Sequence, residues 1–299
     1  MTDLYETAAL IALLRRGDRP WHQEAALVEE AGSAAAVLSG EHVGPSEAST
    51  PQLFGATDRA AVDLPAVEGE VRQWEAEGMQ VVSVLDDEYP ENLRAVFNRP
   101  PLLFIRGELI VRDVRSVAIV GTRRASKAGE TRAGAIARHM TEAGFTVLSG
   151  LAAGIDTASH RGALTAGGRT IAVLGTGLRR SYPASNAELQ EEIAAQCAVV
   201  SQFWPDQPPT KTTFPRRNVT MSGLSLATVV VEASHTSGAR MQARLALEHG
   251  RPVVLLDSLV EQHAWASSYA KRPGTYVISE PDEISGLIER LAFAEALSA

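Results

Sequence analysis

Two glycine-containing turns, the first of them rich in cations, carry the residue types that could do chemistry in this chain. The first turn, Gly121 to Lys127, reads GTRRASK and follows a short apolar run. The second, Ser149 to Gly154, reads SGLAAG and follows the next apolar run. Because each turn leads from a strand into a helix, its free backbone N–H groups and the helix dipole favour an anion. Two such turns predict a phosphate site, whereas one alone would be equally well explained as a tight connection.

Cations recur in four turns that follow predicted strands. These windows, residues 121–127, 175–183, 209–218 and 233–244, hold ten of the 28 basic residues and no Asp or Glu. The carboxyl ends of parallel strands share one edge of a doubly wound sheet, where ligands bind. We therefore expect a positive edge on a chain whose net charge is −8. The alternative is that these cations are solvated or pair with acids from elsewhere.

A cationic edge of this length suits a polyanion better than a mononucleotide, which needs a single phosphate site. Single strands are held by cations that follow the backbone and by aromatic rings on which bases stack. Phe214, three residues after Lys211 and two before Arg216, is placed for stacking. Trp204 lies in a neighbouring loop, and ordinary packing explains it.

Other chemistries have less support. Residues 175–177 supply only the first half of a dinucleotide motif, because Arg180 occupies its third glycine position, and the ATP-type phosphate loop is absent. The seven histidines show no metal-ligand spacing. Asp156 and His160 follow Ser149, but they lie one turn apart on one helix and are predicted to be cap and surface residues, not members of a triad. The sequence predicts no catalytic residue, no metal and no cofactor.

The elements that must position these turns alternate between strands and helices. Apolar runs at 80–85, 102–105, 117–120, 145–148, 170–174, 198–201, 226–231, 253–256 and 276–278 predict strands. Most of the segments between them have helical periodicity. Such alternation gives parallel strands with right-handed crossovers. We therefore predict an α/β fold with a doubly wound, mostly parallel sheet.

The chain divides by composition into three parts. Residues 1–44 are predicted to form a small helical domain, 45–66 a linker rich in Pro, Gly, Ser and Thr, and 67–299 the sheet domain. No apolar run approaches the roughly 20 residues that span a bilayer, and the N-terminus lacks a basic leader. Cys197 is the single cysteine, which fits a reducing compartment. We expect a cytoplasmic protein without a membrane partner.

Several motifs resemble the DNA-processing protein A family (DprA/Smf). In chain order they are Gly121-Thr122-Arg123, SGLAAGID at 149–156, GRTIAVLGTG at 168–177, FPRRN at 214–218 and Val231-Glu232-Ala233 with Ser237-Gly238. The resemblance covers about residues 68 to 256. It implies an extended Rossmann-like fold that binds single-stranded DNA and assists a RecA-type recombinase in DNA uptake and natural transformation (competence). It further implies a homodimer without enzymatic activity.

The resemblance also implies roles for individual positions. Arg123 would contact a phosphate, Lys211 the DNA backbone, and Phe214 would stack on a base. Glycines of the second turn, with Ser237 and Gly238, would form a pocket of backbone amides. The full expected nucleic-acid-binding set is Gly121, Thr122, Arg123, Arg124, Ser149, Gly150, Gly154, Lys211, Phe214, Arg216, Arg217, Asn218, Ser237 and Gly238.

The chain departs from the family pattern mainly towards its ends. Gly17 to Pro20 stands where hairpin glycines are expected, and Ala153 replaces an arginine in the second turn. Residues 257–274 replace a glycine-rich signature, and no C-terminal winged helix is expected. The resemblance implies that these regions matter for recombinase loading and for the mode of dimerisation, and that they matter less for contact with DNA.

Two other functions are compatible with the same residues. The chain could be a nucleotide sensor or an N-glycosidic hydrolase of a related Rossmann-like family, with Glu232 as its acid. Such hydrolases usually carry Pro-Gly-Gly-x-Gly-Thr, whereas residues 234–238 read SHTSG here. The chain could also be a defence or antitoxin interaction module that uses residues 257–299.

Overall fold

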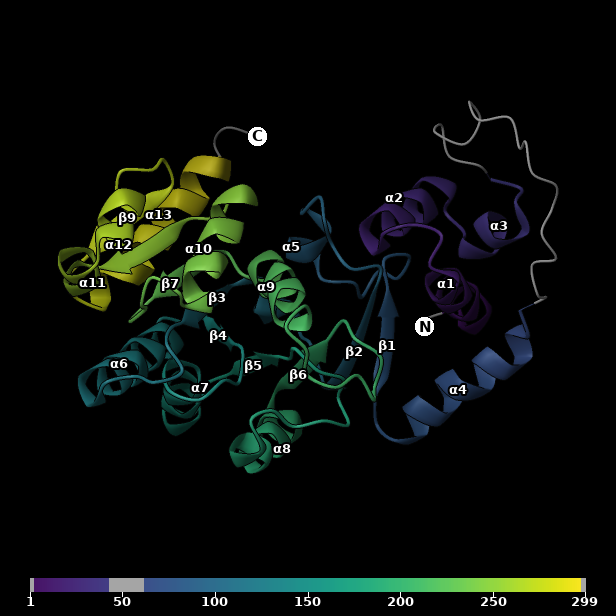
Figure 1. Cartoon of the computed structure of the whole chain (residues 1–299), viewed down its shortest axis with the longest axis horizontal. Helices are drawn as coiled ribbons and strands as arrows, with labels where there is room; N and C mark the ends of the chain where they lie inside the picture. The colour runs from purple at the N-terminus through teal and green to yellow at the C-terminus, as the bar shows by residue number, and fades with distance from the viewer. Residues whose placement is uncertain (1–2, 43–61, 297–299) are drawn as a thin grey trace. The chain divides into compact units, whose positions relative to one another are not determined.

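The structure is a computed structural model that describes residues 3–42 and 62–296, with side chains described to residue 291. The chain separates into two compact units. The first comprises Met1–Tyr89 with Asn98–Leu103, and the second Pro90–Phe97 with Phe104–Ala299. Figure 1 shows the helices and strands of each unit.

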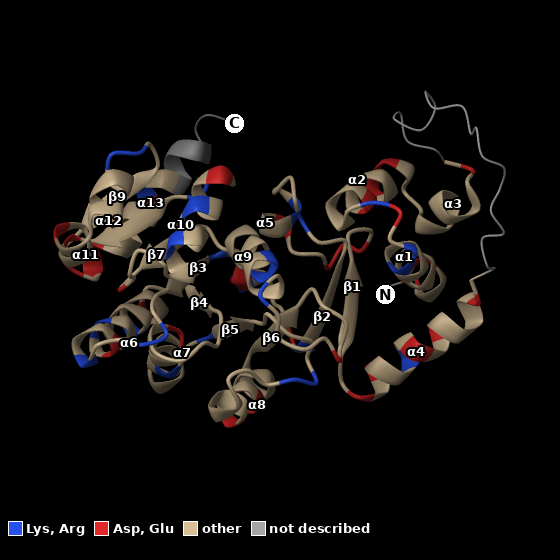
Figure 2. Cartoon of the chain, viewed as in Figure 1, with Lys and Arg blue, Asp and Glu red and all other residues tan. Residues whose placement is uncertain are grey.

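The first unit is mainly helical. Its elements are α1 (Leu4–Arg16), α2 (Trp21–Ala31), α3 (Ala34–Ser39), α4 (Leu64–Ala76) and β1 (Gln80–Ser83), with β1 next to the start of β2 (Leu102–Gly107). Gly17 and Gly32 end α1 and α2 in the left-handed conformation, with φ of 68° and 67°. Acidic residues recur along α2 and α4 (Figure 2).

The helices predicted in residues 1–44 are present as α1 to α3. Of the predicted linker, residues 45–61 lie outside the described residues, and α4 begins at Leu64.

The second unit carries the alternation that the sequence predicts. Its elements are α5 (Glu91–Arg94), most of β2, η1 (Val111–Val114), β3 (Ser116–Val120), α6 (Lys127–Glu142), β4 (Thr146–Ser149), α7 (Ile155–Thr165), β5 (Thr170–Val173), η2 (Ala184–Asn186), α8 (Ala187–Gln196), β6 (Ala198–Ser201), α9 (Thr213–Leu224), β7 (Ala227–Val230), α10 (Gly238–Glu248), β8 (Val253–Leu256), α11 (Asp257–Gln262), α12 (Ala264–Tyr269), β9 (Thr275–Ile278) and α13 (Asp282–Ala296). The segment 257–274 thus forms two short helices and the turn before β9.

The sheet of this unit has the order β2-β6-β5-β4-β3-β7-β8-β9. All neighbours from β6 to β9 are parallel, and β2 is antiparallel to β6. Every residue of β3 to β8 is buried, as expected when helices cover both faces. In Figure 1, α6, α7 and α8 lie on one side of the sheet and α9 and α10 on the other. The predicted doubly wound, mostly parallel α/β fold is confirmed.

The strand order creates a switch point beside β3. From β3 the chain proceeds outward through β4, β5 and β6, then returns to place β7 on the other side of β3. The turns after β3 and β7 therefore diverge to opposite faces, which leaves a crevice at their carboxyl ends.

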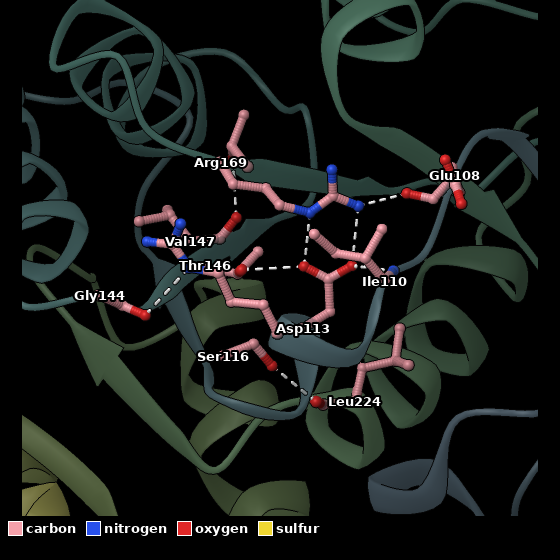
Figure 3. A network of polar contacts seen from close by, with 11 residues as sticks. Glu108, Ile110, Asp113, Ser116, Gly144, Thr146, Val147, Arg169 and Leu224 are labelled. Atoms are coloured by element: carbon pink, nitrogen blue, oxygen red, sulfur yellow. Dashed lines mark hydrogen bonds and ion pairs between the residues drawn. The ribbon is translucent and has the colours of Figure 1, made fainter.

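A polar network joins the opposite, amino-terminal edge of the same strands (Figure 3). The Arg169 guanidinium, just before β5, donates to both carboxylate oxygens of Asp113 at 2.6 and 2.8 Å. The hydroxyl of Thr146, the first residue of β4, donates to the same carboxylate at 2.9 Å. Burial by itself lowers the pKa of Arg169, but the hydrogen bond and charge of Asp113 raise it above its ordinary value. The network fixes the amino ends of β4 and β5 to the segment that precedes β3.

Candidate nucleic-acid interface

A cavity of about 340 Å³ opens at the switch point. Its walls come from the end of β3 and the turn after it, the start of α7, the first turns of α9, and α10 with the loop before it. All of these segments belong to the second unit. The volume lies at the small end of the range for ligand pockets. The predicted site edge therefore contains a real concavity.

Glu232, just after β7, holds the first glycine turn in place. Its carbonyl oxygen accepts the backbone N–H of Thr122 at 2.7 Å. Its carboxylate accepts the backbone N–H of Ser126 at 3.1 Å and the Ser126 hydroxyl at 2.8 Å. A glycine is needed at position 121, where the turn passes close to Glu232, because a Cβ there would lie 2.9 Å from the Glu232 carbonyl oxygen. The turn thus presents Arg123 at the cavity with a fixed backbone.

Arg123 and Phe214 meet at the cavity rim. The guanidinium carbon of Arg123 lies 4.9 Å from the centroid of the Phe214 ring, within cation–π range. The ring of Tyr182 lies 5.5 Å from that of Phe214, at an interplanar angle of 44°. Gly175 makes room for the phenyl group, since a Cβ there would be 2.5 Å from it. The structure brings together the cation and the ring that the sequence singles out, and adds Tyr182 to them.

The second glycine turn differs from the prediction. The backbone N–H groups of Gly150 and Ala152 donate to the Asp156 carboxylate at 3.1 and 3.3 Å, so they are not available to a ligand. Ser149 is fully buried, and its hydroxyl donates to the Ile119 carbonyl at 2.6 Å. The Ser149 hydroxyl and the Gly150 backbone N–H, which belong to the predicted nucleic-acid-binding set, are therefore engaged within the protein in this structure. Ser149 and Gly150 shape the floor beneath the cavity.

Gly154 brings the two turns against each other. Its φ is +77°, a left-handed value that favours glycine, and a Cβ would lie 2.5 Å from the Thr122 carbonyl oxygen. The next residue, Ile155, donates its backbone N–H to that same oxygen at 3.3 Å. Gly154 therefore sets the distance between the turns and lies outside the cavity wall.

Arg217, which belongs to the predicted nucleic-acid-binding set, is an interior cation. It is 6% exposed and donates to the carbonyl oxygens of Gly150 and Val173, both at 2.7 Å, and to the Asn218 side-chain oxygen at 2.9 Å. Burial lowers the pKa of Arg217, and the negative charge of Asp156 opposes that effect. Arg217 and Asn218 reach the cavity wall from inside and support the floor of the site.

Asp156 and His160 are both buried, and the N-cap residue of α7 is Gly154, so the prediction that they are cap and surface residues is wrong. Burial raises the pKa of Asp156, while the nearby Arg217 lowers it. His160 is fully buried, its Nδ1 lies 2.7 Å from the Thr170 hydroxyl, and burial lowers its pKa to about 3. Both side chains belong to the layer beneath the glycine turns.

Arg216 lies over the ring of Phe203, with its guanidinium carbon 5.5 Å from the ring centroid, and the other cations of the four turns divide into two groups. Ion pairs engage three of them, Lys127 with Glu130, Arg179 with Asp206 and Arg244 with Glu248. For these three cations, the alternative stated from the sequence holds, because each pairs with an acid outside the four windows. The exposed cations for which the described residues show no ion pair are Arg123, Arg124, Arg180 and Lys211, and half-buried Arg240 also shows none. Figure 2 shows Lys and Arg on the loop that leads into α8, on α9 and on α10.

Ser237 and Gly238 open α10 at the cavity. Ser237 is the N-cap, and its hydroxyl accepts the Ala239 backbone N–H at 3.2 Å. Gly238 is exposed, with open space where a Cβ would stand. Sequence reasoning missed Gln242, Met221 and Met241, which also line the cavity. A signal for Gln242 existed, since it shares the buried face of α10 with the alanines at 239, 243 and 246.

In the described part of the chain, no group of three or more His, Cys, Asp or Glu side chains is arranged to hold a metal ion. Within residues 3–42 and 62–296, no helix has the length and apolar character needed to cross a bilayer.

Known proteins match both the sequence and the fold. DNA processing protein DprA of Streptococcus pneumoniae is 42% identical over 171 residues, 57% of this chain and 60% of that protein. The X-ray structure of DNA processing protein A from Streptococcus pneumoniae matches with a TM-score of 0.71 and 29% identity, over 95% of this chain and 97% of that one. A Helicobacter pylori structure, described as giving insight into the single-stranded DNA binding mode of its DNA processing protein A, matches in fold with a TM-score of 0.63 and 23% identity, over 71% of this chain and 96% of that one.

The chain spans 44 to 60% of the length of the first curated relatives that it matches. The family model described as DNA recombination-mediator protein A matches residues 80–287, which include the whole cavity and both glycine turns. The chain therefore belongs to the DNA recombination-mediator protein A family.

Proposed function

We propose that this chain binds single-stranded DNA along the carboxyl edge of its sheet and acts as a mediator of recombination. The observation that carries the proposal is the contact between Arg123 and Phe214 at the rim of the switch-point cavity. A cation and an aromatic ring are the two groups that hold a single strand without reading its sequence. The relatives named as DNA processing proteins support the same function.

Each part of the site has a distinct role in this proposal. Arg123, Arg124, Lys211 and Arg216 are exposed and would contact phosphates, and Phe214 would stack on a base. Gly121, Thr122, Ser237 and Gly238 line the cavity and would lie along the DNA backbone. Ser149, Gly150, Gly154, Arg217 and Asn218 would support these groups from below.

The proposal extends to partners and context. A RecA-type recombinase and a second copy of the chain are the expected protein partners, in the cytoplasm, during natural transformation or other recombination. The DNA-binding domain of this proposal is the second unit, Pro90–Phe97 with Phe104–Ala299, in place of the predicted range 67–299. Binding and delivery of DNA require no bond to be made or broken, so the chain is proposed to act without enzymatic activity.

The position of Glu232 favours binding over N-glycosidic hydrolysis. Glu232 is not part of the wall of the switch-point cavity, and its carboxylate accepts hydrogen bonds from Ser126. It lines a second cavity of about 250 Å³ instead, together with Arg132 and His263. A nucleotide held at the first cavity would therefore not meet this acid.

Fluorescence anisotropy with a labelled oligo-dT strand, titrated at several salt concentrations, tests the proposal. We expect the double variant Arg123→Ala/Lys211→Ala to lose most of the affinity and to show a shallower salt dependence. Phe214→Ala should cost about 1–3 kcal/mol per stacked base. Arg112→Ala removes an exposed cation from η1, at the opposite edge of the sheet, and is the matched control. Equal losses from Arg112→Ala and from the double variant would show that the assigned edge is not the binding site.

A further inference from the structure

Gln242 occupies an unusual position for a polar side chain. It lies in the second turn of α10 and is 1% exposed, and neither the oxygen nor the nitrogen of its amide has a hydrogen-bond partner. The same residue forms part of the wall of the switch-point cavity. Buried polar groups are almost always paired in native proteins, so an amide with both ends unpaired calls for an explanation.

The other buried polar side chains of the cavity wall already have partners. The Asp156 carboxylate accepts two backbone N–H groups, and the Arg217 guanidinium donates to two carbonyl oxygens and to Asn218. Among the buried polar side chains of the cavity wall, the Gln242 amide is therefore the group whose donors and acceptor are free to pair with a ligand.

The chemistry of a primary amide narrows the ligand. It offers N–H donors and a carbonyl acceptor side by side. A phosphate or a carboxylate supplies acceptors alone and would leave the amide oxygen unpaired, and a cation would leave the N–H groups unpaired. The edge of a nucleobase carries a donor next to an acceptor, and glutamine pairs with adenine in this bidentate way. A nucleobase thus satisfies both ends of the side chain at once.

Access to the amide requires the cavity to adapt. The amide atoms themselves are closed to solvent, so a ligand reaches them when neighbouring side chains move. Met221 and Met241 line the same cavity, and methionine is unbranched with three rotatable bonds. They can give way to a base at lower cost than branched or aromatic residues.

We propose that Gln242 is a base-reading residue: one nucleobase of the bound strand enters the switch-point cavity and pairs through its edge with the Gln242 amide. This proposal rests on the proposed binding of single-stranded DNA and deepens it, since it adds a base preference to contacts that otherwise follow the backbone. The preferred base is adenine, whose N6 amino group and N7 pair with a glutamine amide in a bidentate way.

Anisotropy titrations with oligo-dA, oligo-dT and oligo-dC, and with an abasic strand of equal length, test this role in the full chain. The variant Gln242→Met keeps the length of the side chain and removes the amide. Thr228→Val is the matched control, because Thr228 is fully buried in β7 with an unpartnered hydroxyl and lies outside the cavity wall. Thermal unfolding of each variant is measured alongside binding.

The wild type should bind its preferred strand about 5- to 150-fold more tightly than the abasic strand, beyond the loss expected from stacking on Phe214. Gln242→Met should lower that ratio, leave affinity for the abasic strand unchanged, and leave the melting temperature equal or higher because an unpaired amide has been removed. Thr228→Val should resemble the wild type in binding.

An unchanged ratio in Gln242→Met, with DNA binding intact, would overturn the base-reading role and leave the proposed function standing. Destabilisation by Gln242→Met, with affinity for all strands lowered equally, would identify a structural residue and also overturn it. Failure of the wild type to bind any strand at low salt would overturn the proposed function, and the base-reading role with it.

Discussion

His160 should make the stability of this protein depend on pH between 5 and 7. The imidazole is fully buried in α7, and its Nδ1 lies 2.7 Å from the Thr170 hydroxyl, while Nε2 has no partner. Burial, and then the nearby Arg217, lower its pKa to about 3, against an ordinary value of about 6.5. Between pH 3 and pH 6.5, His160 is therefore mostly protonated in the unfolded chain and mostly neutral in the folded chain.

The sign and size follow from this difference. A depressed folded pKa means that the contribution is fully present above pH 6.5 and is lost as the pH falls towards 3. Each pH unit below the unfolded pKa costs up to about 1.4 kcal/mol, so the loss between pH 7 and pH 5 is about 2 kcal/mol from this group alone.

Urea unfolding at a series of pH values, for the wild type and His160→Asn, measures the effect. Asparagine keeps a polar atom near Nδ1 for the Thr170 hydroxyl and does not titrate. We expect the difference in unfolding free energy between the two proteins to shrink by about 2 kcal/mol from pH 7 to pH 5. Parallel pH profiles would refute the assignment, because they would show that the imidazole either charges in the folded state or is exposed.

Three further perturbations probe the framework of the site. Glu232→Ala should weaken DNA binding although it removes a negative charge, because the turn that carries Arg123 loses its hydrogen bonds to the carboxylate. Glu232→Gln should recover part of the affinity. Anisotropy at fixed salt measures both variants, and tighter binding by Glu232→Ala would contradict the anchoring role. Asp113→Asn should lower the unfolding free energy by about 3 kcal/mol, because it leaves the largely buried Arg169 without its counter-ion, and urea unfolding would contradict this if the loss were below about 0.5 kcal/mol. Gly150→Ala should cost about 1–3 kcal/mol, because the added Cβ would lie 1.9 Å from a buried guanidinium nitrogen, and an unchanged melting temperature would show that the floor of the site can yield.

Periodicity was sufficient to predict the sheet and the edge at which the cavity opens. Apolar runs separated by helical segments force parallel strands, and parallel strands place their following turns along one edge. Arg123 and Phe214 are 91 positions apart in the sequence, yet they meet because Arg123 follows β3 and Phe214 follows β6, and both strands end at that edge. The position of the contact thus follows from topology, which composition and spacing can reveal.

The hydrogen-bond and ion-pair partners of the polar groups could not be predicted from the sequence. Gly150 offers a backbone N–H at a helix N-terminus, but Asp156, six residues later, accepts it before any ligand can. Arg217 and Arg216 are adjacent in a run without apolar periodicity, and only packing decides that Arg217 faces inward. Arg179 was counted in an acid-free window, and its partner Asp206 lies in a different loop. The contacts of Arg179 and Arg217 join segments that are far apart in the sequence, and the contact between Gly150 and Asp156 depends on how the turn folds.

These pairings change the salt dependence expected for DNA binding. If all ten cations of the four turns neutralised phosphates, the logarithm of affinity would fall with the logarithm of salt concentration at a slope of about −7, at about −0.7 per phosphate on a single strand. Three of the ten are in ion pairs and Arg217 is buried with its donors occupied, so at most six remain. The slope should then be no steeper than about −4. The substitution Asp206→Asn, which frees Arg179, should steepen it by up to about 0.7, whereas Glu261→Gln, which changes charge equally on an exposed part of α11, should not. A wild-type slope near −7 would mean that DNA opens the ion pairs and that the unbound arrangement of these cations does not describe the bound one.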